Sequence, residues 1–100
     1  MADATFTLFR GAAATSNTTL YTSPSDIAVA VTNIAITNTT ASAATATVNL
    51  ATIALVSSVS VAANTTQFID LEQIIYNAET ITASASTTGV NFHIAGYEVY

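Results

Sequence analysis

The sequence predicts an all-β protein, with residues 1–100 forming one antiparallel, jelly-roll-like β-sandwich of about eight short strands. Three observations predict this fold. Apolar and polar residues alternate with a period of two through much of the chain. β-Branched residues are frequent, and turn signals recur at short intervals. No apolar stripe with the 3.6-residue period of a helix persists, so we expect no helix longer than a connecting turn.

The first expected strand covers residues 5–10, where alternation puts Thr7 and Phe9 on one face and Leu8 and Arg10 on the other. Gly11 and the small residues that follow it end this strand. Residues 18–22 form a short second strand. The segment 23–26 then reads as a turn, because Pro fixes φ and the side chains of Ser and Asp bond to nearby backbone.

The third strand, residues 27–38, has the strongest pattern. Val29 and Val31 share one face, whereas Ile34 and Ile36 fall in the opposite phase. The phase slip near Thr32 and Asn33 predicts a β-bulge, or a bend where the strand passes from one sheet to the other.

The remaining strands are shorter. We expect strands at 45–50, 52–56, 58–62, 66–71 and 79–86 (with Ile81 facing inward), and a last strand that starts at 90–94 and continues after a phase shift to Tyr100. Residues 71–77 are expected to form a connection with at most one helical turn. A phase shift at Ala95 and Gly96, ahead of Tyr97, predicts a second bulge.

The tripeptide Asn-Thr-Thr occurs at residues 17–19, 38–40 and 64–66, each time at a strand edge. Each copy matches the N-glycosylation sequon. The first five residues lack the basic start and apolar block of a signal peptide, so we expect synthesis in a cytoplasm and no glycosylation. Asn as an Asx-turn residue is the favoured interpretation.

The composition excludes several functions. The chain has one Lys or Arg (Arg10), six Asp or Glu, no Cys and a formal net charge of -5. Nucleic acids and anionic membranes are bound through Lys and Arg, so neither is an expected partner. The longest apolar run, residues 27–31, is far too short for a membrane helix. A surface of Thr, Ser, Asn and Ala loses little side-chain entropy when another surface covers it, which favours a role in packing.

Candidates for chemistry are few, and we expect neither enzymatic activity nor a cofactor or metal. His93 is the only histidine and lies mid-strand, where a surface or interface role is favoured. Asp70 and Glu72, with Glu79 in the next loop, fit a carboxylate-pair hydrolase or a calcium site only loosely. Solvated acids at a loop edge are the favoured interpretation.

Several segments together resemble small virion proteins of tailed bacteriophages. They are residues 9–13, 19–22, 32–34, 38–48, 61–66, 69–71, 79–85 and 90–98, so the resemblance covers nearly the whole chain. It implies a β-sandwich that coats the capsid or belongs to the tail or neck, and it brings no catalytic or binding residue with it. The chain departs from the pattern at Tyr76-Asn77-Ala78-Glu79, where a glycine or further polar residues are usual.

From this resemblance and the low charge we expect a capsid decoration protein. Its partner is then the major capsid protein, which it binds on the outer surface of the shell. The chain itself is expected to form a homo-oligomer, a trimer around local three-fold positions. A tail, neck or fibre-base protein is the alternative. A lesser alternative is a glycan-binding sandwich in which Tyr76, Tyr97 and Tyr100 stack on a sugar.

The composition also predicts self-association. Residues 43–61 contain no charge and no proline, and the chain has no lysine to protect the edge of a sheet. We therefore expect the isolated protein to form an oligomer or to pair strands between copies.

Overall fold

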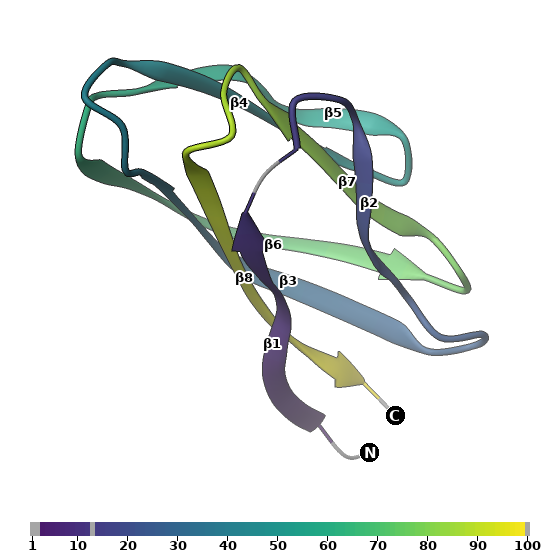
Figure 1. The fold of residues 1–100 in the computed structure, drawn as a ribbon. Coiled ribbons are helices and arrows are strands. Elements are labelled where there is room, and N and C mark those ends of the chain that lie inside the picture. Colours follow the sequence, from purple (N-terminus) through teal and green to yellow (C-terminus); the bar gives the residue numbers. More distant parts are fainter. Residues whose placement is uncertain (1–2, 13, 100) are drawn as a thin grey trace.

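The computed structural model describes residues 3–12 and 14–99, and for residues 3–6 and 99 only the backbone. It is an all-β sandwich of eight strands in two four-stranded sheets (Figure 1). The strands are β1 (Asp3–Ala12), β2 (Thr18–Thr22), β3 (Ala28–Asn38), β4 (Ala44–Leu50), β5 (Ile53–Val61), β6 (Thr65–Tyr76), β7 (Thr80–Ala85) and β8 (Val90–Val99). The predicted fold class is confirmed.

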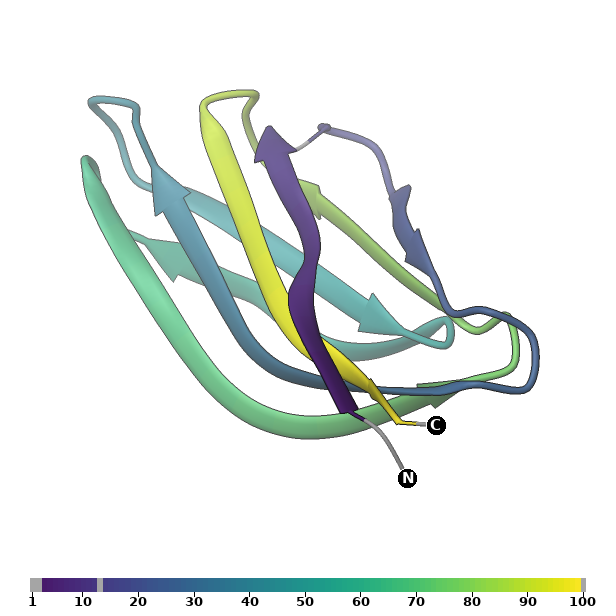
Figure 2. The ribbon, with the colours of Figure 1, turned by 90° about the horizontal axis from the view of Figure 1, so that it is seen from below.

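The strand order is that of a jelly roll. One sheet runs β1-β8-β3-β6 and the other β2-β7-β4-β5. The first strand therefore pairs with the last, the second with the seventh, the third with the sixth and the fourth with the fifth, all antiparallel. A long hairpin rolled into two layers has this pairing. Figure 2 shows β6 and β1 at opposite edges of the first sheet.

The core lies between the two sheets. Alternate residues of the central strands point into it, because successive side chains of a strand face opposite sides. In β4 the alternation is strict, with Ala46, Val48 and Leu50 buried and Thr45 exposed, as predicted. The largest side chains with no exposed surface are Phe92, Ile34, Ile36, Ile75, Ile81 and Ile94.

The predicted irregularity of the third strand is confirmed as a bulge. The register of β3 shifts between Val31 and Asn33 against both of its neighbours. The extra residue brings Ile34 back to the face occupied by Val31, and both are fully buried. The suggested passage between sheets is wrong, since β3 stays in one sheet along its whole length.

The face assignment of the first strand is wrong at Phe9. A register shift between Thr7 and Phe9 inserts Leu8 as an extra residue against β8. Leu8 is buried, and Phe9 also packs against the core, while Thr7 and Arg10 are exposed. Strict alternation could not anticipate two consecutive inward side chains.

The last strand has no extra residue of its own. The register shifts beside Ala95 arise in the neighbouring strands β1 and β3, and β8 runs unbroken to Val99. The bulge expected at Gly96 is therefore wrong. Close packing requires a glycine at position 96 instead, because a Cβ there would overlap the carbonyl oxygen of Ala30 and press on Leu8.

Two further boundaries differ from the prediction. The expected strands 52–56 and 58–62 form the single strand β5, which has a positive φ of 52° at Ser58. The segment 71–77 is not a helical connection, since β6 continues to Tyr76. Asn77 and Ala78, both with positive φ, then form the tight turn to β7, closed by a bond from the Glu79 amide to the Tyr76 carbonyl.

Candidate interaction surface

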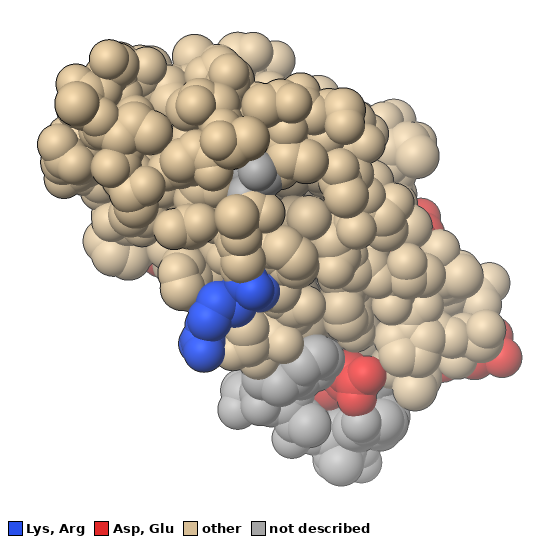
Figure 3. Space-filling model, viewed as in Figure 1, with Lys and Arg blue, Asp and Glu red and all other residues tan. Residues whose placement is uncertain are grey.

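The surface of the molecule is largely uncharged. In Figure 3 one basic side chain and a few acidic ones are scattered over a face that is otherwise neutral. Thr, Ser, Asn and Ala supply most of the exposed positions among the described residues. Such side chains carry few charges that would need partners when another molecule covers them.

The large apolar side chains that remain exposed are confined to two strands. Among the described residues they are Ile53, Leu55, Phe68, Ile74 and Tyr76. The first two belong to β5 and the other three to β6. Each is one of the two edge strands of its sheet, and the two lie side by side at the same side of the sandwich. We call this the β5–β6 side.

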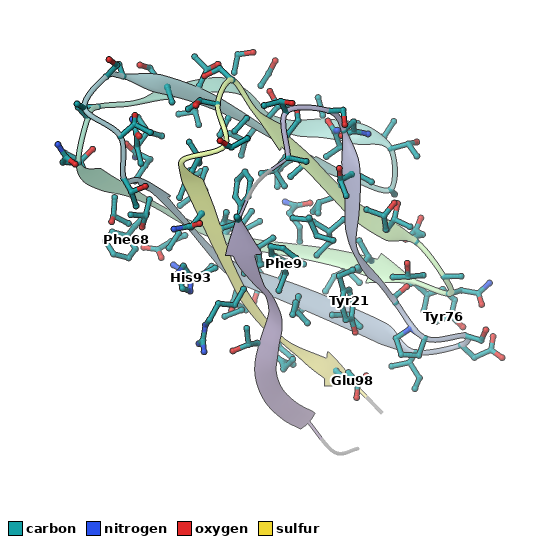
Figure 4. All side chains as sticks on the ribbon, in the orientation of Figure 1. Phe9, Tyr21, Phe68, Tyr76, His93 and Glu98 are labelled. Atoms are coloured by element: carbon teal, nitrogen blue, oxygen red, sulfur yellow. The ribbon has the colours of Figure 1, made fainter. Side chains whose placement is uncertain are left out.

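Strand β6 concentrates the features of a docking surface. Its alternation puts Phe68, Asp70, Glu72, Ile74 and Tyr76 on the outer face, opposite the inward Ile75. Phe68 is 67% exposed and Ile74 57%. Figure 4 shows Phe68 and Tyr76 toward opposite ends of the molecule, so the two carboxylates separate the apolar positions. An exposed edge strand of this length is a template for pairing with another chain.

His93 lies on the outer face of the same sheet. It is directly opposite Arg10 of β1 on one side and Ala35 of β3 on the other. The Arg10 Nε–H donates to His93 Nδ1 at 3.2 Å, so the histidine acts as an acceptor here. Its exposed position agrees with the expected surface role.

The carboxylates do not form one site. Asp70 Oδ1 accepts a bond of 2.9 Å from Asn33 Nδ2, within the outer face of the sheet. Glu79 lies beyond the end of β6, where its Oε1 accepts the Tyr76 backbone amide. Within the described part of the chain, no three His, Cys, Asp or Glu side chains are grouped to hold a metal ion.

Two of the three candidate tyrosines share a face. Tyr76 is opposite Ala28, and Tyr97 is opposite Ala30 across the other edge of β3, so both lie on the outer face of their sheet. Tyr76 is exposed and Tyr97 is half-buried. Tyr100 lies outside the described residues.

Tyr21 belongs to β2 and Glu98 to β8, strands of different sheets, and Figure 4 labels both side chains. Partial burial of the Tyr21 phenol raises its pKa above 10.0, and the negative charge of Glu98 raises it further. Both causes favour the neutral phenol.

The three Asn-Thr-Thr copies differ in their environment. Asn38 is fully buried, and its Oδ1 accepts the Thr40 amide at 2.9 Å, which confirms the Asx turn at this copy. Asn17 and Asn64 are exposed.

Comparison with known proteins adds no identification. Neither protein-family models nor curated proteins nor solved structures give a match to this chain. Over residues 3–12 and 14–99, no helix is long and apolar enough to cross a membrane.

Proposed function

We propose that this chain is a non-enzymatic structural protein of a bacteriophage particle, a decoration protein on the outer surface of the assembled major capsid protein. The observation that carries the proposal is the neutral surface with its exposed apolar residues gathered on the β5–β6 side. A jelly roll is also an architecture that capsid proteins use repeatedly. That is an analogy of fold, and fold alone does not define function.

The proposed mechanism is stabilisation by mass action. A protein that binds the assembled shell and not its free subunits lowers the free energy of the shell with every copy bound. Apolar contacts from Phe68 and Ile74 supply affinity, and the neutral surface around the β5–β6 side leaves Asp70 and Glu72 as the charged groups between them that binding would cover. Many copies bound to one shell then resist its expansion and disassembly.

The test is the number of copies per particle. Purified virions are dissociated, and the chain is quantified against the major capsid protein by mass spectrometry. We expect a stoichiometry near one copy of the proposed trimer per local three-fold position. A handful of copies per particle would instead assign the protein to the tail, neck or fibre base.

A location in the tail, neck or fibre base is favoured by the free edge of strand β6. Strand β6 is a twelve-residue edge strand without proline, which suits pairing with a strand of a neighbouring tail protein. Labelling the chain in electron micrographs of virions separates the two locations, since label on the shell excludes the tail and label on the tail excludes decoration.

A glycan-binding role is favoured only by the shared face of Tyr76 and Tyr97. Aromatic side chains on one exposed face can stack on sugar rings. If this were the function, the Tyr76→Ala variant would lose binding to a glycan array while retaining its fold and its attachment to the particle.

A further inference from the structure

We propose that copies of this chain associate head to tail, with β6 of one copy pairing with β1 of the next, so that the β1-β8-β3-β6 sheet continues from copy to copy. The proposal concerns the chain alone and does not depend on which particle it belongs to. It assigns a partner, a second copy, to the two free edges of one sheet.

The direction of the strands permits this pairing. Each neighbouring pair in the sheet is antiparallel, so β1 and β6 run in opposite directions. When a second copy is placed beside the first with the same face outward, its β1 is antiparallel to β6 of the first copy. The junction then has the same hydrogen-bond geometry as the pairs within the sheet.

Charge complementarity favours this pair of edges. Arg10, the only Lys or Arg of the sequence, lies on the outer face of β1, directly opposite His93. Asp70 and Glu72 lie on the outer face of β6, the other edge. Side chains directly opposite each other in a sheet share a face, so the junction can bring Arg10 against a carboxylate.

One register of this junction both pairs Arg10 with a carboxylate and covers part of the exposed apolar surface of β6. With Arg10 opposite Asp70, antiparallel pairing puts Ala12 opposite Phe68, whose side chain is otherwise 67% exposed. Asp70 already accepts a bond from Asn33 within its own sheet, which holds the carboxylate on the outer face. The bulge at Leu8 limits the regular pairing to residues 9–12 of β1.

The other edge pairings are less favourable. Two copies of β6 paired around a two-fold axis through Leu71 would put Asp70 opposite Glu72 twice, which is repulsive. Strand β5 carries no charge, but its left-handed residue Ser58, opposite Thr47, interrupts the edge near its middle. This irregularity divides the edge of β5, whereas the bulge of β1 lies at Leu8 and leaves residues 9–12 as a regular run.

The experiment is a charge exchange read by sedimentation velocity and mass photometry over a range of concentrations. We expect the wild-type protein to form an oligomer, and Arg10→Glu or Asp70→Arg to raise its dissociation constant about tenfold or more, because like charges then meet at the junction. The double variant Arg10→Glu/Asp70→Arg restores the opposite charges and is expected to recover most of the affinity. Raised salt should weaken the wild-type oligomer.

The control for charge is Thr45→Arg, at an exposed position of β4 in the other sheet, which should leave association unchanged. Circular dichroism of every variant establishes that it is folded. A wild-type protein that stays monomeric at high micromolar concentration overturns the proposal. So does an oligomer that is insensitive to both single charge changes, or a double variant no better than the single ones, since each result places the interface elsewhere.

Discussion

At the scale of single residues, Tyr21 links the stability of the fold to pH. Burial and the charge of Glu98 raise the pKa of its phenol in the folded protein above the ordinary value of 10.0. The folded state therefore keeps a proton that the unfolded state has already lost at alkaline pH. The stabilising contribution is complete below pH 10.0 and is lost as pH rises through the higher folded pKa.

We therefore expect the urea midpoint to fall with rising pH above about 10, and to fall less in a Tyr21→Phe variant, which has no phenol to ionise. The exposed Tyr76 provides the matched control, because Tyr76→Phe should leave the alkaline loss as it is in the wild type. Equal slopes for the wild type and Tyr21→Phe would contradict this assignment.

The environment of an individual residue was the hardest property to predict from sequence. The Asx role of Asn38 followed from the Asn-Thr-Thr pattern, but nothing local distinguishes that copy from the exposed ones at 17 and 64. The difference depends on which strands meet around it. His93 could be placed on a surface, whereas its contact with Arg10 required the pairing of the first strand with the last.

At the scale of elements, the period-two pattern predicted strands wherever one face is clearly apolar, as in β4. The bulge in β3 was detectable because valines and isoleucines on either side of it are out of phase. The bulge in β1 could not be detected from the sequence, because Leu8 and Phe9 are both apolar and either can face inward. The length of β6 was missed because Ile74, Ile75 and Tyr76 are consecutive apolar residues, which hide the alternation.

The turn between β4 and β5 gives a prediction at this scale. Its two central residues, Ala51 and Thr52, have φ of 51° and 66°, in the left-handed region that a type I′ turn requires. A β-branched residue is disfavoured there and glycine is not. We expect Thr52→Gly to stabilise the protein by roughly 0.5–1 kcal/mol, the strain relieved being partly offset by the greater freedom of glycine in the unfolded chain.

Chemical denaturation measures this change. Thr45→Gly is the matched control, because the same substitution within strand β4, where the backbone is extended, should destabilise by a similar amount. If both substitutions lowered the stability, the backbone of the turn would not be the source of strain.

At the scale of the whole molecule, the candidate surface could not be found from the sequence alone. Composition predicted a neutral surface suited to packing, and the absence of lysine indicated unprotected edges. Which strands form those edges is decided by the rolled topology, which makes β5 and β6 neighbours at one side and leaves β1 at the other. Ile74 fell in the expected connection 71–77, and its exposure, like that of Phe68, follows from the outer face of the long edge strand β6.

Asn38 joins the two sheets at one end of the sandwich. It ends β3, and its Nδ2 donates across the core to the carbonyl of Val61, the last residue of β5, at 3.0 Å. The same nitrogen donates to the Ser42 carbonyl at 2.8 Å, and Oδ1 accepts both the amide and the hydroxyl of Thr40. The side chain is fully buried, so water cannot replace these partners when it is removed.

We therefore expect Asn38→Ala to lower the free energy of unfolding by roughly 3 kcal/mol, since it leaves several buried polar groups without partners and creates a small cavity. Asn38→Asp should also destabilise, because it keeps the acceptor for Thr40 but replaces both donated bonds with a buried carboxylate. Asn17→Ala, at an exposed Asn-Thr-Thr copy with one bond to Asn49, should cost well under 1 kcal/mol. Urea unfolding of the three variants measures these values. A loss for Asn38→Ala no larger than that for Asn17→Ala would show that the sheets are held together by their apolar core alone.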